Sequence, residues 1–434
     1  MRSYSCLVLL FLLLLSAWPV AAQDVEEPPA SYGGKTVAQW VADLQDLESQ
    51  GSDDKRRRAA YALGRLGPAA RSAVASLIEV VNDPNMEPRW YAVDALGRIG
   101  GDEKVAEVLA DAIRKPENDV YVRLNAVKSL GRLGDVAGGQ TEVLVEQLSG
   151  RDAAVRAAAA RSLWQVARRP ESLAALKSML TAPSSEEVFQ ACVVLEQLGD
   201  DARPLIGELV AVLGSDNADA RRAASKALGG LGDEAAKAVG EAINTPSASV
   251  DGAAAAAALG LHVDRVREQV LYRVETPAAA FNAAVRGVLD AVVPPLTKLL
   301  ALPDEKVRLE AGRALARCGS LAVPALLTAL QSDNEAMRTS AADALARLER
   351  YLPEDAAPNA NLAGLNKFLV RPLTDAMRGE SFEVRYGAIR AAAALRLGSE
   401  AAEMKPLLTE ALEDEDAGIR RYAAQTLASI NAAK

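Results

Sequence analysis

Aromatic residues, histidine and cysteine are all scarce in this chain of 434 residues. Phe, Tyr and Trp together make up 4% of the sequence, and there are three cysteines and one histidine. A single histidine cannot form a histidine-based metal site, and so few cysteines exclude a scaffold that depends on disulfides. Segments in which β-branched or aromatic residues alternate with period two are also rare, so no strand is predicted. These absences point away from a β-protein, a disulfide-rich domain and a histidine metalloenzyme.

Ala, Leu and Val supply most of the apolar content instead. Half of the residues are hydrophobic although aromatics contribute so little. Abundant Ala, Leu, Glu and Arg with scattered Gly is typical of short, closely packed helices. Acidic residues outnumber basic residues, 58 to 49, which gives a formal net charge of −9 at pH 7. We therefore expect no binding of nucleic acid, although an acidic chain can still carry a local basic face.

Residues 1–22 have the pattern of a secretory signal peptide. Arg2 supplies a positive charge, residues 7–15 form an apolar run, and small residues precede Gln23. The apolar run is shorter than the roughly 20 residues that cross a membrane, so we expect cleavage after Ala22 rather than a retained anchor. The mature protein would then be secreted or periplasmic and free of the membrane. Its net charge would be −10, because Arg2 is the single charged residue that is removed.

One short phrase recurs along the chain. It begins with Arg, continues with Ala three residues later and Leu seven residues later, and often has Gly eight and eleven residues later. The clearest copies begin at Arg56, Arg89 and Arg123, and successive copies from Arg56 to Gly252 are separated by 33, 34, 33, 32, 33 and 31 residues. The other copies begin at Arg156, Val188, Arg221, Gly252, Arg308, Arg338, Arg385 (with altered spacing) and Arg420. Eleven copies at so regular a period indicate a repeat array.

Each copy of the phrase is expected to be the second helix of a two-helix unit. An apolar segment with helical spacing precedes it, and turn residues separate the two. In several copies an Asp that can cap the helix stands four residues before the first phrase residue: Asp119, Asp152, Asp304 and Asp416. In several copies a Gly follows the helix, at Gly67, Gly100, Gly134, Gly199 and Gly232. The recurring Asp and Arg suggest a structural ladder of hydrogen bonds between repeats.

The consensus D-x-x-V-R-x-x-A-x-x-A-L-G-x-L-G, over residues 36–431, resembles the HEAT-repeat superfamily, particularly the HEAT-like repeats of phycobilisome lyases. The segment from Tyr32 to Thr36, running into Trp40, is also similar to the beginning of secreted bacterial HEAT-repeat proteins, with Thr36 as a helix N-cap. The resemblance implies an all-α fold: a right-handed α-solenoid of about eleven helix pairs, whose second helices line a concave surface. Lyase activity is not expected, because phycobilin lyases act on cytoplasmic chromoproteins and this chain carries an export signal.

The period divides the chain after the signal peptide into four segments. These are a linker at 23–35, a first array at 36–262, surplus residues at 263–292, and a second array at 293–434 that includes an exposed polar loop at 350–366. The surplus residues have helical periodicity and are either a diverged repeat or an inserted helical hairpin. Insertions escape the packing constraints of a repeat, so function often resides in them.

No cluster of groups suited to catalysis is evident. His262 is expected to end a helix, where a polar or positive side chain suits the helix dipole. Cys192 and Cys318 occupy helix-packing positions and are interpreted as buried free thiols. The paired His-Glu motifs of the metal-dependent HEAT-repeat hydroxylases are absent, and the repeated L-G-x-L-G ends a helix rather than opening a phosphate loop. We therefore expect no enzyme activity, no cofactor and no bound metal.

Positions one, five and nine after the Arg should face solvent on the second helices. Basic and aromatic residues at or beside them are candidates for a binding face: Arg57, Arg58, Tyr61, Trp90, Tyr91, Lys128, Arg161, Trp164, Phe189, Arg222, Lys226 and Arg313. Arg and large aromatics are enriched at binding hot spots. A structural explanation stays open, because basic residues in a last helical turn complement the dipole and aromatics can fill gaps between Ala-rich helices.

The sequence thus predicts a monomeric, non-catalytic scaffold that presents this face to a protein partner, through an acidic or extended segment of that partner. Two alternatives stay open. The first is an enzyme, or an accessory subunit of one, whose site includes residues 263–292; a bound cofactor would favour it. The second is a binder of acidic polysaccharide along the same face. Salt-sensitive binding to polyanions would distinguish the second alternative from a protein partner held by apolar contacts.

Overall fold

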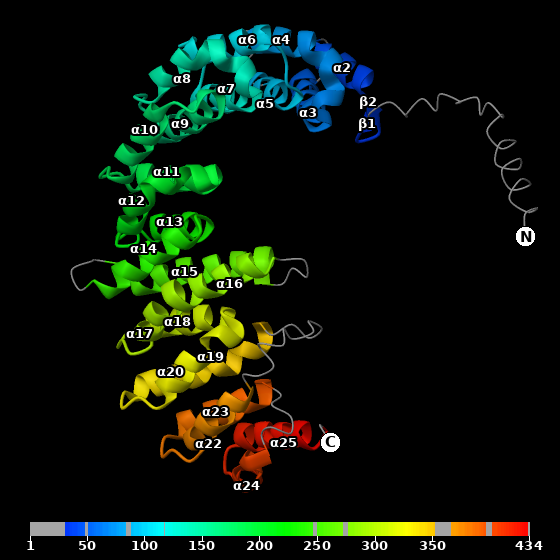
Figure 1. Cartoon of the computed structure of the whole chain (residues 1–434). Coiled ribbons are helices and arrows are strands. Elements are labelled where there is room, and N and C mark those ends of the chain that lie inside the picture. The colour runs from blue at the N-terminus through cyan, green and yellow to red at the C-terminus, as the bar shows by residue number, and fades with distance from the viewer. Residues whose placement is uncertain are drawn as a thin grey trace, which may run out of the picture. The chain divides into compact units, whose positions relative to one another are not determined.

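The computed structural model describes residues 31–47, 51–83, 88–116, 118–245, 250–271, 277–351, 366–395 and 402–432. The predicted signal peptide lies outside these ranges, as do most of the predicted linker at 23–35 and of the predicted loop at 350–366. The described chain is an all-α solenoid, drawn in Figure 1. It divides into two compact units, residues 1–140 and 141–434, which are treated separately below.

The first unit contains three helix pairs behind a short hairpin of β1 (Ser31–Tyr32) and β2 (Lys35–Thr36). The pairs are α2 (Val37–Gln45) with α3 (Ser52–Leu66), α4 (Val74–Asn82) with α5 (Arg89–Ile99), and α6 (Glu103–Arg114) with α7 (Val120–Leu133). The 3₁₀ segments η1 (Gly67–Ala73) and η2 (Gly134–Gln140) follow α3 and α7. The second helices α3, α5 and α7 contact one another in order, and the first helices α2, α4 and α6 form the other layer (Figure 1).

The second unit continues the pattern with eight pairs in its described residues. They are α8 (Thr141–Gln147) with α9 (Ala153–Ala167), α10 (Pro170–Leu180) with α11 (Ser185–Leu198), α12 (Ile206–Val212) with α13 (Ala218–Gly230), α14 (Asp233–Asn244) with α15 (Gly252–Val266), α17 (Val293–Leu299) with α18 (Glu305–Arg317), α19 (Val323–Leu330) with α20 (Glu335–Arg347), α22 (Asn366–Met377) with α23 (Phe382–Leu395), and α24 (Lys405–Glu410) with α25 (Ala417–Ala432). The second helices again contact one another in order. The described ranges of both units together therefore hold the eleven pairs that the phrase predicts.

Helix boundaries follow the predicted capping residues. Asp119 Oδ1 accepts a hydrogen bond from the backbone N–H three residues later at 2.8 Å. Asp152, Asp304 and Asp416 make the same contact. Thr36 closes a capping box at the start of α2. The five glycines predicted to end helices all have positive φ, which other residues rarely adopt and which turns the chain towards the next helix.

The leading Arg of a phrase holds the turn that precedes its own helix. In Arg308 and Arg338 the Nη1 atom donates to the carbonyls five and six residues earlier, at 2.7–2.9 Å. The predicted ladder between repeats is present in part, because Arg56, Arg89 and Arg221 each also bind a side chain of the following repeat. The turn leaves carbonyls without helical partners, and these are the nearest acceptors for the guanidinium. Individual copies add a link to the next repeat, as from Arg156 Nη2 to Glu187 Oε1 at 2.7 Å.

Ala and Leu from the phrase form the core between the helices. Ala59, Leu63, Ala92 and Leu96, at phrase positions three and seven, are completely buried. Gly97, at position eight, lies against the following second helix, where a Cβ atom would overlap Ser129. Small residues at this position allow successive second helices to pack closely.

The surplus residues at 263–292 lengthen two helices. Helix α15 continues as the π-helix η4 (Arg267–Leu271), and α16 (Ala278–Gly287) runs through the π-helix η5 (Val288–Val292) into α17. The described part of this segment is thus two helical extensions that contact each other rather than a further complete pair, and we call it the hairpin extension. π-turns are rare and occur frequently at functional sites.

The hairpin of β1 and β2 corrects the prediction that the chain has no strand. Gly33 and Gly34 have φ values of 58° and 78°, which form the tight turn. Trp40 Nε1 donates to the carbonyl of Tyr32 at 3.0 Å and ties the hairpin to α2. Strands of two residues are too short to produce an alternating pattern in the sequence. Among the described residues, no helix combines the length and apolar character that crossing a membrane requires.

Candidate functional site

The twelve candidate residues all lie on second helices, and none of them is buried. The exposed members are Arg58, Tyr61, Lys128, Arg222, Lys226 and Arg313, and the part-buried members are Arg57, Trp90, Tyr91, Arg161, Trp164 and Phe189. The structure brings them together as two sets, on α3, α5 and α7 in the first unit and on α9, α11 and α13 in the second. Arg313 lies apart from these sets, because α15 separates its helix from α13.

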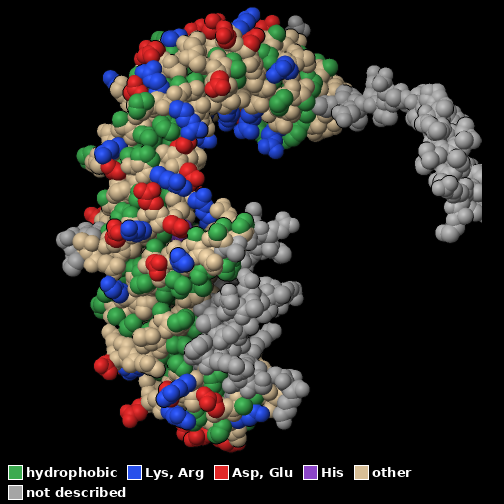
Figure 2. Space-filling model, in the orientation of Figure 1, with side chains coloured by type: hydrophobic (Ala, Val, Ile, Leu, Met, Phe, Trp, Pro, Cys, Tyr) green, Lys and Arg blue, Asp and Glu red, His purple; other side chains and the backbone are tan. Residues whose placement is uncertain are grey.

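Positive charge is in excess on α3, α5 and α7. Asp94 accepts ion pairs from Arg98 Nε and Arg132 Nη1, each at 2.6 Å. Arg58 and Arg65 have no ionic or hydrogen-bonding partner among the described residues. Figure 2 shows Lys and Arg side chains gathered along this edge of the first unit. Arg98 and Arg132, both at position nine, therefore bind a carboxylate of the protein itself. Arg57 of α3 likewise pairs with Asp54, whereas Arg58 and Arg65 of the same helix keep their donors available for another molecule.

The aromatic residues of the first unit differ in how much surface they offer. Tyr61 is 48% exposed, and its ring meets the edge of Tyr32 at a centroid distance of 6.3 Å. Trp90 and Tyr91 are part-buried and lie ring against ring, with centroids 3.5 Å apart. The gap-filling explanation therefore suits Trp90 and Tyr91, and Tyr61 is the aromatic side chain of this set that remains open to a partner.

In the second unit the aromatic candidates hold the repeats together. Trp164 Nε1 donates to Asp201 Oδ2 at 2.8 Å, and Arg168 Nη1 binds the same oxygen at 2.5 Å. The Arg168 guanidinium also lies 5.5 Å from the Trp164 ring centroid. Phe189 packs against the hydrophobic core. These two aromatic rings therefore have a structural role, which leaves Arg222 and Lys226 as the exposed cations of the set.

Two exposed cations of α13 extend the set. Arg222 pairs with Asp219 one turn earlier at 2.8 Å, and both side chains are about 70% exposed. An exposed ion pair of this kind contributes about 0–1 kcal/mol to stability, so Arg222 can exchange Asp219 for a carboxylate of a partner at little cost. Lys226 has no ionic or hydrogen-bonding partner among the described residues. The structure thus leaves Lys226 fully available and Arg222 nearly so.

His262 lies at the base of the hairpin extension, and its predicted role was wrong. It does not end a helix, because α15 runs on to Val266, and it is only 2% exposed. Burial lowers the pKa of its imidazole, although the nearby Asp233 carboxylate, 3.2 Å from Nε2, acts in the opposite direction. A neutral, buried ring cannot act as the cation that complements a helix dipole. It fills the core between α14 and α15 instead.

The cysteines match their interpretation as buried free thiols. Burial raises the pKa of Cys192 and that of Cys318 to about 12 each. A nucleophilic cysteine needs a thiolate near neutral pH, so neither side chain is suited to covalent catalysis. Within the described ranges, no group of three or more His, Cys, Asp or Glu is arranged to hold a metal ion.

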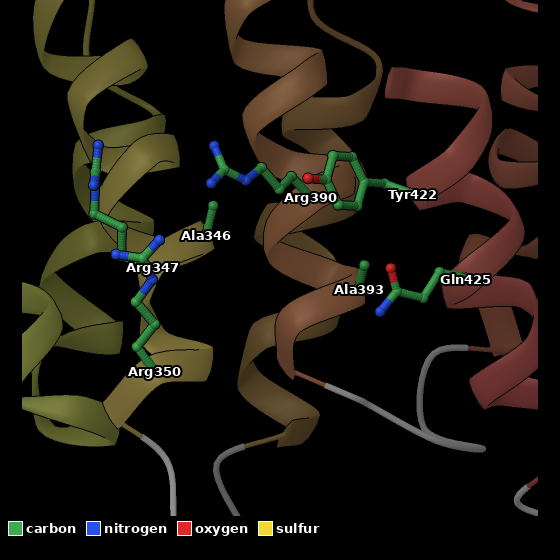
Figure 3. Close-up of a pocket in the computed structure, with 7 residues that line it drawn as sticks. All are labelled: Ala346, Arg347, Arg350, Arg390, Ala393, Tyr422 and Gln425. Carbon is green, nitrogen blue, oxygen red and sulfur yellow. The ribbon is translucent and has the colours of Figure 1, made fainter. Parts of the chain in front are cut away.

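Sequence reasoning missed a hollow on the second-helix layer near the end of the second unit, which Figure 3 shows. Arg347, Arg390 and Tyr422 contribute to its lining. Arg347 occupies position nine, Arg390 position five, and Tyr422 position two of their phrases. The altered phrase from Arg385 has Ala where other copies have Leu at position seven, so its register was uncertain. Reading position five in that copy would have found Arg390.

Comparison with known proteins identifies the family. Residues 42–131, 293–359 and 370–434 match the profile of HEAT repeats, which amounts to just over half of the chain. The chain belongs to the HEAT-repeat family. A curated relative, the phycocyanobilin lyase subunit alpha of Picosynechococcus sp., is 32% identical to this HEAT-repeat protein over 176 residues. The match covers 36% of this chain and 64% of the relative, so the chain spans less than two thirds of that relative's length.

Solved structures show the same fold. Karyopherin Kap121p bound to the extreme C-terminus of the protein phosphatase Cdc14p is similar with a TM-score of 0.51 and 14% identity, over 99% of this chain and 48% of that one. A mutant form of Kap121p gives a TM-score of 0.52 and 15% identity, over 98% and 47%. The HEAT-repeat protein thus covers about half of these karyopherin chains. Identities this low support the solenoid fold, which is typical of protein-interaction scaffolds.

Proposed function

We propose that this HEAT-repeat protein is a non-catalytic scaffold that binds an acidic or extended segment of a protein partner on its second-helix face. The observation that carries the proposal is a set of available cations on one helix layer of a chain with net charge −9. Arg58 and Arg65 in the first unit and Lys226 in the second have no partner among the described residues. Arg222 is held by one exposed pair.

The similar structures support a protein rather than a small molecule as the ligand. The Kap121p structure carries the extreme C-terminus of another protein, Cdc14p. A solenoid exposes one long face because each repeat contacts only its neighbours, and such a face suits an extended chain. In this protein Arg58 and Arg65 lie two turns apart on α3, and Arg222 and Lys226 lie one turn apart on α13. Within each unit this spacing suits carboxylates along a segment rather than a single compact ligand.

The other candidate functions have less support. Binding of an acidic polysaccharide would use open aromatic rings for stacking on sugars, but Trp164 is held by Asp201 and Phe189 packs against the core. An enzyme site at the hairpin extension could not use His262 as an acid or base open to substrate. His262 at its base is almost fully buried. If residues 1–22 are cleaved as a signal peptide, the scaffold would act outside the cytoplasm. It would act as a monomer.

The test is a capture experiment with two matched variants. The face variant carries Arg58→Ala, Arg65→Ala, Arg222→Ala and Lys226→Ala. The control variant removes four exposed cations from the other side of the repeats, by Arg71→Ala, Lys104→Ala, Lys237→Ala and Arg371→Ala. Each protein, without residues 1–22, is immobilised and exposed to an envelope extract of the source cells, and the bound proteins are identified by mass spectrometry.

The proposal predicts a partner that the wild-type protein and the control variant retain and that the face variant loses. Binding of that partner should also weaken as salt is raised, because exposed charges are screened. Equal capture by both variants would contradict the use of this face. Capture of heparin, but of no protein, through the same four residues would favour the polysaccharide instead.

A further inference from the structure

A hollow lies between the last second helices of the second unit. It begins beyond the point at which two of these helices, α20 and α23, approach each other closely. Gly387 on α23 lies so near α20 that a Cβ atom there would overlap Ala342. Farther along both helices, Ala346 and Ala393 are buried and line the hollow with one-carbon side chains. The space has a volume of about 120 Å³, which is enough for a small polyatomic group rather than a single water.

Three arginines surround this hollow. Arg347 and Arg350, at the end of α20 and in η7 (Leu348–Tyr351), lie on one side, and Arg390 on α23 faces them (Figure 3). Asp343 is the carboxylate near them, 3.7 Å from Arg347 Nη2 and 3.8 Å from Arg390 Nη1. Both distances are too long for hydrogen bonds. Arg350 has no ionic or hydrogen-bonding partner among the described residues. Asp343 thus lies near two of the three guanidinium groups, and the third has no carboxylate partner in the part of the chain that the structure describes.

The opposite wall, on α25, adds two polar side chains, Tyr422 and Gln425. Tyr422 points its hydroxyl towards Arg390, and Gln425 lies beside it (Figure 3). The Tyr422 ring meets the edge of Tyr386 at a centroid distance of 6.0 Å, and the Arg390 guanidinium lies 6.0 Å from the Tyr422 ring centroid. Tyr386 is fixed in turn, because Gly418 lets α25 approach its ring closely. The packed ring of Tyr422 thus positions its hydroxyl as a donor, and the exposed Gln425 adds an amide donor.

We propose that this hollow, the C-terminal arginine pocket, binds the phosphoryl group of a phosphate monoester. Like charges held close together repel, so three arginines beside a single carboxylate favour an anion between them. A carboxylate carries one charge and two oxygens, which one guanidinium fork can satisfy. A phosphate monoester carries about −1.5 to −2 charges and three terminal oxygens at pH 7. It can therefore accept hydrogen bonds from all three arginines and from Tyr422 together, and it balances the surplus of two positive charges.

The C-terminal arginine pocket differs from the binding surface proposed above on the second-helix face, both in its position and in the chemistry of its ligand. The candidate residues of that face lie on α3 to α13 and on α18, whereas the pocket is lined by α20, η7, α23 and α25. Its volume accommodates the phosphoryl group alone, so the rest of the ligand would extend over the surface of the second helices. Binding of phosphate is therefore independent of whether the scaffold proposal holds.

Calorimetric titration of the full chain with inorganic phosphate tests the proposal, with sodium chloride at matched ionic strength as the reference. Arg390→Gln should weaken phosphate binding about 10- to 100-fold, the loss expected for a charge-assisted hydrogen-bonding partner. Arg350→Gln, at an exposed residue, should also weaken binding without affecting the fold. Arg371→Gln on α22 removes one exposed cation that has no partner among the described residues, and it should leave the dissociation constant unchanged.

Three further measurements identify the chemistry of the bound anion and the kind of molecule that carries it. Acetate should bind more weakly than phosphate, and binding of a phosphate monoester should weaken as pH falls below its second pKa of about 6. Glycerol phosphate and a phosphoserine peptide then distinguish a small metabolite from a modified protein, according to which binds more tightly. A phosphate affinity no greater than that of chloride would overturn the proposal, as would equal losses in Arg390→Gln and Arg371→Gln.

Discussion

Replacing Arg56 by alanine should destabilise the first unit far more than replacing its neighbour Arg58. Arg56 is 4% exposed, and its Nε donates to the carbonyl of Leu44 at 3.1 Å. Its Nη2 pairs with Asp83 Oδ2 at 2.5 Å. One side chain thus connects α2, α3 and the turn that follows α4. The substitution removes both contacts at once, whereas Arg58→Ala removes an exposed side chain without a described partner.

The structure gives the expected size of the loss. Leu44 is completely buried, and leaving a buried carbonyl without a partner costs about 1–3 kcal/mol. Removing one partner of a fully buried ion pair costs about 3–5 kcal/mol, but the Asp83 side chain is 20% exposed and water can replace part of the lost interaction. The two effects share one guanidinium and do not add. We expect a decrease of about 3 kcal/mol in the free energy of unfolding, against at most about 0.5 kcal/mol for Arg58→Ala.

Urea unfolding followed by far-ultraviolet circular dichroism measures both variants. Repeat arrays can lose terminal repeats before the rest, so hydrogen exchange of the amides in α2, α3 and α4 should be measured alongside. Faster exchange confined to these helices would agree with the prediction. A loss below about 1 kcal/mol for Arg56→Ala, or equal losses for Arg56→Ala and Arg58→Ala, would refute the assignment of Arg56 as a structural residue.

Three other predictions follow from burial and packing. Because burial raises the pKa of Cys192 and of Cys318 to about 12, iodoacetamide at pH 8 should label both only after unfolding; labelling of the native protein would contradict their burial. Gly97→Ala should cost about 1–3 kcal/mol in urea unfolding because its methyl group has no space, while Gly230→Ala, which meets open space within a helix, should be neutral or stabilising. Burial lowers the pKa of His262 below its usual 6.5 in the folded protein. As pH drops below 6.5, the imidazole therefore takes up a proton more readily in the unfolded chain, and the free energy of unfolding should decrease. His262→Gln should remove this part of the pH dependence, and an unchanged slope would count against the burial of a neutral ring.

The repeat architecture was predictable because each signal occurs many times. The period, the capping Asp residues and the glycines with positive φ each recur, and a single ambiguous copy does not change the count of eleven pairs. The partner of an individual side chain has no such redundancy. The sequence places Trp164 on a second helix. Its hydrogen bond to Asp201, however, depends on the segment between α11 and α12.

The remaining misses have the same physical origin. Several leading arginines bind carbonyls of their own turn, which lie nearest, and only some also bind the next repeat. No residue type in the sequence records this difference. His262 is buried because α15 continues through the hairpin extension instead of ending there. The arginine pocket combines side chains from three repeats, one of which, headed by Arg385, departs from the consensus. Periodicity predicts which face a residue is on, but not which side chains from different repeats meet.

Site-specific photo-crosslinking tests the central claim, use of the second-helix face, most directly. A benzophenone amino acid is placed at Tyr61 or Lys226 on the second helices, and at Lys104 or Lys237 on the first helices as exposed controls. The protein is irradiated in its own cells, and crosslinked partners are identified by mass spectrometry. The account predicts one shared partner at Tyr61 and Lys226 and none of it at Lys104 or Lys237. Crosslinks to a partner from Lys104 and Lys237 alone would show that the opposite face is the one in use.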